Sequence, residues 1–261
     1  MTPPVALSRL SKPVCGLTVS GKRSRGTLMQ SPSKALSEAL GASRAVLFDF
    51  DGPICDVFRG LPAPSVADEL ARLLAQRAPC LGDRARATDD PMEVHRISWE
   101  GGSALLAAVE GALTAAEIRA VRVAGPPVEG AELALRAAYD AKRPIAVVSN
   151  NSAACVVEFL EIHRLADLVA EVIGRPSLRP DLMKPAPYPL LTATNALGVE
   201  PAEAVLVGDA VTDIEAAKAA GVRSIGFANK PPKRAVLADA GADAIVLDMR
   251  AVADALTYRA D

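Results

Sequence analysis

Residues 44–52 read RAVLFDFDG, and this stretch decides the fold that we expect for the rest of the chain. The apolar run Ala45–Phe48 does not alternate with polar residues, which is typical of a strand buried on both faces of a parallel sheet. The run ends in Asp49 and Asp51, which share one face because side chains alternate along a strand. Gly52 then permits a tight turn. The stretch therefore predicts two carboxylates at the carboxyl end of a buried parallel strand.

Similar apolar runs recur along the chain and are separated by segments with helical periodicity. The further predicted strands are 144–148, 169–173, 204–207, 223–227 and 244–247, and the helices are 128–142, 152–160, 188–197, 213–220 and 233–240. Strands that alternate with helices indicate right-handed βαβ units. We therefore expect an α/β fold with a doubly wound, mostly parallel, Rossmann-like sheet.

One long segment interrupts this alternation and predicts a second structural unit. It shows helical patterns at 65–77, 91–99, 103–112 and 115–123 and no convincing strand. We expect a small all-helical insert at 60–127, placed after the first strand, within a core formed by 41–59 and 128–261. Residues 1–40 form a basic extension rich in Ser, Thr, Pro and Gly, and we expect disorder through about residue 30.

Composition excludes several classes of function. A formal net charge of −2 lacks the positive footprint of a duplex-binding protein, and 3% aromatic residues cannot supply a stacking platform for single strands. The apolar runs are all shorter than the roughly 18–20 residues that a membrane span needs. We expect a soluble monomer or homodimer without nucleic-acid or membrane partners.

The cysteines indicate a reducing compartment and argue against a zinc site. Cys15, Cys55, Cys80 and Cys155 are widely spaced without a CxxC pair, and only two histidines are present. Such scattered ligands do not fit a zinc site. We expect free thiols in a reducing cytoplasm.

Polar residues follow the other predicted strands at the edge where ligands bind in open α/β sheets. Ser149 and Asn150 follow the second strand, and Asp209 follows the fourth, with Asp213 four residues later. Lys184 lies in a loop and is the only lysine between 142 and 218 in a chain that prefers arginine. A compact ammonium at this point suits a charged site.

If these strand ends converge, four carboxylates gather: Asp49, Asp51, Asp209 and Asp213. Two such charges about 4 Å apart repel by about 4 kcal/mol at an effective dielectric constant near 20, so the cluster requires a cation. Oxygen ligands suit a hard ion, and a site that works on phosphate indicates Mg²⁺.

Each of these residues also has an interpretation without function. Asp213 lies in a capping-box pattern and is consistent with a helix cap alone. Lys184 by itself is consistent with a solvated loop lysine, and Ser149 with a strand end. The order of the four motifs along the chain carries more weight than any one of them.

This ordered set resembles the haloacid dehalogenase superfamily, in particular its phosphatase branch with a C1-type helical cap, which is similar to phosphoglycolate phosphatases and β-phosphoglucomutases. The resemblance covers residues of about 44–248 and implies that 60–127 is the cap. It implies Asp49 as the nucleophile that forms an aspartyl phosphate and Asp51 as the general acid and base. Lys184 would neutralise developing charge and orient Asp49.

The resemblance also assigns ligands. Ser149 and Asn150 would hold phosphoryl oxygens, the latter by its backbone or its amide. The Asp49 carboxylate, the Asp51 main-chain carbonyl and Asp209 would coordinate Mg²⁺. Asp213 would support Lys184 or a metal-bound water.

One position departs from the family pattern. Pro53 stands where Thr or Val is usual, and we expect a stiffer loop with the chemistry retained. Cap specificity could involve Arg59, Arg84, Arg86, His95 or Arg96, although the stripe of Met92, His95, Arg96 and Trp99 favours packing.

The leading interpretation is a Mg²⁺-dependent hydrolase of a small phosphomonoester metabolite. A phosphosugar mutase of the same family needs the same two aspartates and stays open. A catalytically silent scaffold whose basic tail binds an acidic partner is the non-enzyme alternative. Dehalogenation and phosphonate hydrolysis are disfavoured because those branches lack the acid at Asp51.

Overall fold

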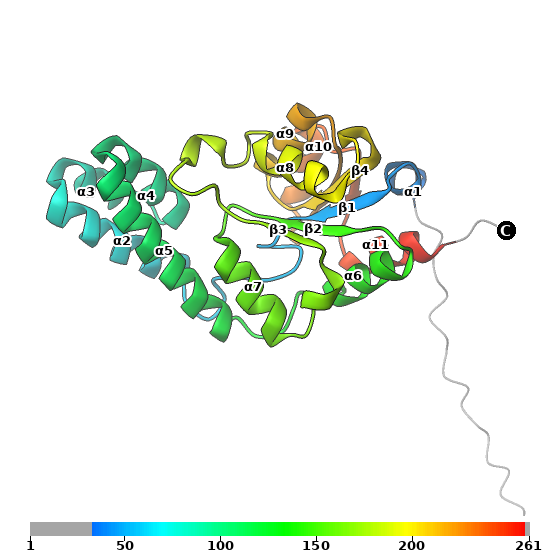
Figure 1. Cartoon of the computed structure of the whole chain (residues 1–261), viewed down its shortest axis with the longest axis horizontal. Helices are drawn as coiled ribbons and strands as arrows, with labels where there is room; N and C mark the ends of the chain where they lie inside the picture. Colours follow the sequence, from blue (N-terminus) through cyan, green and yellow to red (C-terminus); the bar gives the residue numbers. More distant parts are fainter. Residues whose placement is uncertain (1–32, 259–261) are drawn as a thin grey trace, which may run out of the picture. The chain divides into compact units, whose positions relative to one another are not determined.

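The computed structural model describes residues 33–258, and its centre is one six-stranded parallel sheet (Figure 1). The strand order is β3-β2-β1-β4-β5-β6. The strands are β1 (Ala45–Phe48), β2 (Ile145–Val148), β3 (Glu171–Ile173), β4 (Ala204–Gly208), β5 (Arg223–Phe227) and β6 (Ala244–Val246). All six predicted strands are present, so the predicted α/β fold is confirmed.

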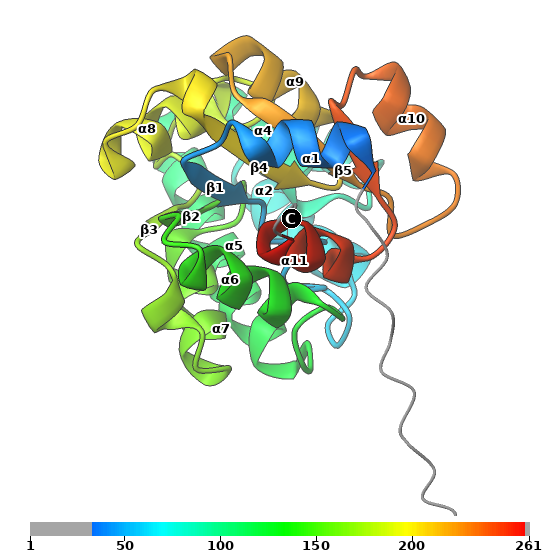
Figure 2. The ribbon, with the colours of Figure 1, turned by 90° about the vertical axis from the view of Figure 1, so that its right-hand side faces the viewer.

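Helices cover both faces of the sheet, as a doubly wound fold requires. They are α1 (Lys34–Gly41), α6 (Ala131–Asp140), α7 (Ala153–Ile162), α8 (Tyr188–Leu197), α9 (Val211–Ala220), α10 (Lys233–Asp239) and α11 (Met249–Thr257). Val46 and Phe48 of β1 pack with α1, α6, α7 and α11, whereas Ala45 and Leu47 pack with α8 and α9. Figure 2 shows α6 and α11 on one side of the strands and α8 and α9 on the other.

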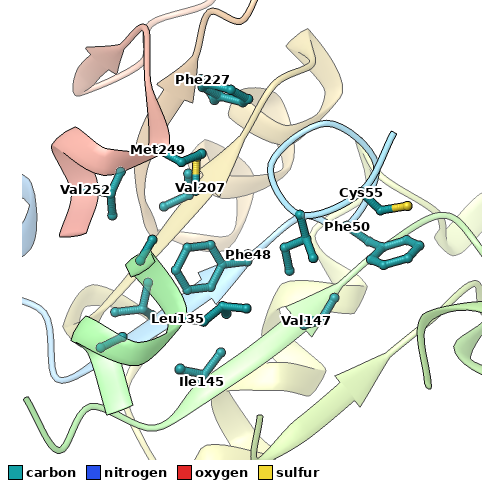
Figure 3. Packing of buried hydrophobic residues seen from close by; sticks show 14 of the residues in the cluster. Phe48, Phe50, Cys55, Leu135, Ile145, Val147, Val207, Phe227, Met249 and Val252 are labelled. Atoms are coloured by element: carbon teal, nitrogen blue, oxygen red, sulfur yellow. The ribbon is translucent and has the colours of Figure 1, made fainter. Parts of the chain in front are cut away.

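The larger of the two hydrophobic clusters that flank β1 lies on the α6 and α11 face. Figure 3 shows Phe48 of β1 within this cluster, with Leu135 from α6 and Met249 from α11 around it. All three side chains are fully or almost fully buried. The non-alternating apolar sequence of β1 is explained by this arrangement, because each of its faces meets a different helical layer.

The core begins earlier than the sequence predicts. Helix α1 starts at Lys34, inside the predicted extension, and the Ser33 side chain caps it by accepting a hydrogen bond from the backbone N–H of Leu36 (3.3 Å). Leu36 and Leu40 are buried in the larger core cluster. The predicted disorder through residue 30 lies outside the described residues.

The insert between β1 and β2 is helical. It contains α2 (Ala63–Arg77), α3 (Pro79–Ala85), α4 (Pro91–Ser98), a 3₁₀ turn (Trp99–Gly101) and α5 (Ser103–Val123). Leu70, Val94, Val109 and other residues form a separate apolar cluster. The two helices predicted for 103–123 are one, because Leu113 and Ala116 continue the same buried stripe. The limits 60 and 127 stay a prediction.

Two further observations concern membrane spans and cysteines in the described part of the chain. Among residues 33–258, every helix is too short or too polar to cross a membrane. Cys55, Cys80 and Cys155 are free thiols, as predicted, and Cys15 lies outside the described residues.

Candidate active site

The carboxyl ends of β1 and β4 bring the predicted acids together. These strands are neighbours, with Phe48 opposite Val207, so the residues that follow them emerge side by side. The carboxylates of Asp49, Asp209 and Asp213 each place an oxygen within 4.8 Å of the others. The predicted convergence is therefore present for three of the four acids. Asp51 lies on the turn that follows β1, and its carboxylate is not part of this group.

Two glycines make this close approach possible. Gly52 has φ +111°, and a Cβ there would lie 2.3 Å from Cγ of Asp209. A Cβ on Gly208 would lie 2.5 Å from Cβ of Asp213. Any side chain at either position would push a carboxylate out of the cluster, so both glycines are required by geometry.

Lys184 reaches this cluster from the loop before α8. Its Nζ lies 2.7 Å from Oδ1 of Asp49 and 2.6 Å from Oδ1 of Asp213, and it donates to the carbonyl of Val148 at 3.0 Å. The side chain is 2% exposed. Burial alone lowers the pKa of Lys184, but the carboxylates of Asp213 and Asp49 outweigh it and raise that pKa. The lysine is a fixed cation, not a solvated loop residue.

Asp213 serves a helix and the site at once. Its Oδ2 accepts hydrogen bonds from the backbone N–H groups of Asp209 and Ala210, both at 3.0 Å, at the start of α9. Its Oδ1 pairs with Lys184. The helix-cap interpretation and the supporting role are thus both compatible with one carboxylate.

The pKa values of Asp49 and Asp51 are both raised above their ordinary values. Burial, reinforced by the negative charge of Asp213, raises the pKa of Asp49 well above its usual value. Burial raises the pKa of Asp51 to about 6, although a hydrogen bond from the backbone N–H of Val57 (3.0 Å) opposes the shift. A cation placed among these groups would reverse the shift at Asp49, because an opposite charge favours the ionised form.

Lys233 is a contact that sequence reasoning missed. Its ammonium pairs with Oδ2 of Asp209 from the start of α10. Burial raises the pKa of Asp209, and this ion pair opposes that rise. The sequence gives no sign of the pair, since the two residues are far apart along the chain and Lys233 opens an otherwise ordinary helix.

The strand β2 ends in a loop of hydrogen-bonded polar residues. Asn150 donates from its amide to the carbonyl of Lys184 (3.1 Å) and accepts from the backbone N–H of Lys184 (2.9 Å). Ser149 donates from Oγ to Oδ1 of Asn151 (3.2 Å) and accepts from the backbone N–H of Asn151 (3.1 Å). The Asn150 amide is thus engaged with the lysine loop, which leaves its backbone N–H as the group able to contact a phosphoryl oxygen.

A cleft of about 590 Å³ opens over these groups. Its floor includes Asp49, Lys184 and Asp209, and the insert contributes the segment from Thr88 to Met92. Sequence reasoning named none of 88–91 as cleft residues. The candidate specificity residues lie elsewhere: Arg59, Arg84, Arg86 and Arg96 pair with Asp56, Glu100, Asp83 and Glu93, and His95 is buried beside Glu110.

Pro53 fits the turn after β1 without a lost contact. The turn is closed by the N–H of Gly52, which donates to the carbonyl of Cys55 (2.7 Å), and by the N–H of Ile54, which donates to that of Phe50 (3.1 Å). Pro53 itself is buried between them. Its missing N–H therefore removes no bond of the turn.

Comparison with known proteins identifies the family. The family model described as haloacid dehalogenase-like hydrolase matches residues 43–221, which include every site residue predicted from the sequence but not Lys233. The chain belongs to this family. The resemblance drawn from the order of the motifs is thereby confirmed.

Curated relatives and solved structures agree with this membership. Phosphoglycolate phosphatase of Neisseria meningitidis is 32% identical over 204 residues, covering 73% of this chain and 83% of the relative. Phosphoglycolate phosphatase of Rhodospirillum rubrum is 31% identical over 239 residues, covering 82% and 91%. A β-phosphoglucomutase structure from Clostridium difficile has a TM-score of 0.58 at 17% identity, covering 80% of this chain and 92% of that chain. The structure supports the fold alone.

Proposed function

We propose that this chain is a Mg²⁺-dependent phosphatase that hydrolyses a small phosphomonoester through an aspartyl phosphate on Asp49. Its family and its curated relatives support a phosphatase of a small phosphorylated substrate. The observation that carries the proposal is how the two oxygens of the Asp49 carboxylate are hydrogen-bonded. Oδ1 accepts hydrogen bonds from Lys184 (2.7 Å) and from the backbone N–H of Phe50 (2.7 Å), whereas no hydrogen bond among the described residues uses Oδ2.

This arrangement supports the first step of the proposed reaction. Oδ2 of Asp49 would attack phosphorus, and the bond from phosphorus to the ester oxygen would break. Asp51, whose pKa is raised to about 6 and which is therefore protonated more often than an ordinary aspartic acid, would give its proton to the departing oxygen. Lys184 would offset the negative charge that develops on the phosphoryl group.

The second step would reverse the role of Asp51. As a carboxylate it would take a proton from water, whose oxygen attacks phosphorus and breaks the bond to Asp49. Inorganic phosphate leaves, and Asp51 is protonated again for the next turnover. Ser149 and the backbone N–H of Asn150 would hold phosphoryl oxygens during both steps.

The donor set fits a hard divalent cation. Asp49, Asp209 and the main-chain carbonyl of Asp51 would hold Mg²⁺, and Asp213 belongs to the same carboxylate cluster. When bound, the ion neutralises charge on the phosphoryl oxygens and on the carboxylates themselves.

Turnover tests the proposal. Wild-type protein with Mg²⁺ should release phosphate steadily from an aryl phosphate, and EDTA or Asp49→Asn should abolish the release. Asp56→Asn is the matched control, because Asp56 is an exposed acid just beyond the motif that pairs with Arg59. A wild-type protein that releases no phosphate from a broad panel of phosphomonoesters would contradict the proposal.

The same panel of phosphomonoesters narrows the class of substrate. 2-Phosphoglycolate belongs in it because of the relatives' names. Glycerol phosphate belongs in it because the cleft residues of the insert, Thr88 to Met92, include Asp89 and no cation, so a neutral leaving group avoids charge repulsion. Product analysis with a hexose 1-phosphate separates hydrolysis, which yields free sugar, from the mutase alternative, which yields an isomeric sugar phosphate. A cytoplasmic location stays a prediction from the cysteines.

A further inference from the structure

Helix α5 of the insert presents one polar face to the loop that follows β3. Glu110, Thr114 and Glu117 are spaced by four and three residues, which places them on one face of a helix. Oε1 of Glu110 accepts from Oγ of Ser177 (3.1 Å), and its Oε2 accepts from the backbone N–H of Leu178 (2.9 Å). This contact binds the insert to the core.

The other two residues of this face hold Arg175, which is buried. Nη1 of Arg175 lies 2.8 Å from Oε1 of Glu117, and the two side chains are 2% and 0% exposed. Nη2 donates to Oγ1 of Thr114 (3.1 Å). Two charges taken out of water stabilise a protein little or not at all compared with apolar side chains of similar size. The pair therefore calls for a role other than stability.

Glu117 also holds the loop that ends β2. Its Oε1 accepts from Nδ2 of Asn151 (3.1 Å), and its Oε2 accepts from the backbone N–H of Ser152 (3.0 Å). Because an ionised carboxylate can only accept, it fixes which end of the Asn151 amide faces it. The opposite end, Oδ1, accepts from Oγ of Ser149 (3.2 Å). A line of oriented hydrogen bonds thus runs from the insert to Ser149.

Arg175 acts on the same loop from its other side. Its Nη1 donates to the carbonyl of Asn150 (3.1 Å), the residue whose amide is bonded to the backbone of Lys184. It also lies 3.7 Å from Sδ of Met92, a cleft residue of the insert. One guanidinium therefore contacts the insert on two helices and the core loop that follows β2.

We propose that Glu117 and Arg175 are positioning residues that hold residues 149–152 in the geometry that receives the phosphoryl group. The insert thereby contributes to phosphate binding through a buried ion pair that does not itself reach Asp49. This inference rests on the proposed function, because it assigns phosphate contacts to Ser149 and Asn150.

Glu117→Gln tests the inference with almost no change of shape. A glutamine amide has one accepting oxygen and one donating nitrogen, so it cannot accept from both Nδ2 of Asn151 and the backbone N–H of Ser152. Residues 149–152 then lose one of the bonds that hold them in place. We expect the KM for an aryl phosphate and the inhibition constant for inorganic phosphate to rise by about tenfold, as for loss of one oriented charge-assisted bond. We expect kcat to change by less than about threefold, because Asp49, Asp51 and Lys184 are untouched.

A double variant separates positioning from stability. Glu117→Gln leaves the Arg175 charge buried without a partner, so its melting temperature should fall. Glu117→Gln combined with Arg175→Gln removes both charges and should regain most of the melting temperature, but not the phosphate affinity. If the single variant fails to fold, the double variant carries the test. The proposal would be overturned if the double variant recovered both the melting temperature and the phosphate affinity. Unchanged phosphate affinity in both variants would overturn it too.

The control and a binding readout complete the experiment. Arg122→Gln removes a surface pair with Glu158 that also joins α5 to α7 (2.7 Å) but does not contact residues 149–152, so phosphate affinity should not change. Calorimetric titration of each protein with inorganic phosphate in Mg²⁺ measures affinity without turnover. A wild-type protein that binds phosphate but hydrolyses nothing would overturn the proposed function, while weaker phosphate binding in Glu117→Gln would still support this inference.

Discussion

Two buried cations lie on the segment that joins β3 to α8, and they differ in how far their charge is compensated. Arg175 meets one carboxylate, Glu117, and both side chains are almost fully buried. Lys184 is buried to the same degree but meets two carboxylates, Asp49 and Asp213. With Asp209, which pairs with Lys233, three carboxylates face two ammonium groups. The arginine pair is neutral, whereas the lysine cluster retains negative charge.

This difference suits the two sites to different roles. The arginine pair connects the insert to the core, and the lysine cluster is the candidate reaction centre. The charges of Arg175 and Glu117 cancel, and both carboxylate oxygens and both Nη atoms already make hydrogen bonds, so the pair offers little to a ligand. The planar guanidinium suits several fixed bonds at once. A cluster with excess negative charge is stable only when a further cation shares it. Removal of Lys184 and removal of Arg175 should therefore impair different properties of the protein.

The largest effect is expected at the lysine cluster. Lys184→Met leaves two buried carboxylates facing each other and removes the charge that orients Asp49. We expect kcat to fall by about 10³-fold or more, comparable with the loss of a group that stabilises transition-state charge. Steady-state phosphate release measures the change, and Lys218→Met, at an exposed lysine of α9, should keep wild-type rates. Near-normal turnover in Lys184→Met would show that Lys184, like Arg175, is not required for the reaction itself.

A smaller effect, on stability, is expected at the arginine pair. Arg175→Met leaves Glu117 as an uncompensated buried charge, which typically costs about 3–5 kcal/mol of unfolding free energy. Arg175→Met with Glu117→Leu replaces the pair by apolar groups and should recover most of that loss. Urea unfolding at neutral pH measures both. If the single and double variants lost the same free energy of unfolding, the shape of these side chains and not their charge would determine stability here.

The smallest effect concerns His95, which is fully buried in the insert with Nε2 3.1 Å from Oε2 of Glu110. Burial, together with the positive charge of Arg175, lowers the pKa of His95, although Glu110 and Glu117 oppose the shift. The folded protein then binds fewer protons than the unfolded chain, so stability is complete above the unfolded value near 6.5 and is lost as pH falls below it.

Replacing His95 by glutamine should therefore flatten the dependence of stability on pH. Urea unfolding of wild type and of His95→Gln between pH 8 and pH 5 measures the two slopes. The wild-type free energy of unfolding should fall more steeply on the acid side. Parallel curves would mean that His95 does not titrate differently in the folded protein.

Much of this molecule is readable from its sequence because the deciding signals are local. The six strands are short apolar runs that end in polar residues, and the acids at Asp49 and Asp209 follow them directly. Lys184 stands out because lysine is rare in that part of the chain. These features need no knowledge of distant contacts.

The parts that the sequence does not reveal depend on distant contacts. Arg175 and Glu117 are 58 residues apart, and no spacing rule connects them. A signal was nevertheless present, since Glu117 lies on the buried, mainly apolar side of α5, where an unpaired acid would be costly. Helices α1 and α11 were missed because each is short and is stabilised by packing with the other and with the sheet.

The aspartyl phosphate on Asp49 can be trapped in a single turnover of radiolabelled aryl phosphate by the Asp51→Asn variant with Mg²⁺, quenched in acid. Aryl oxide needs little help to leave, so Asp49 should still be phosphorylated, while the second step lacks its base. We expect about one equivalent of released phenol and protein-bound label that hydroxylamine removes and that maps to the peptide carrying Asp49. Release of phenol and free phosphate together, with no label on the protein, would contradict the account.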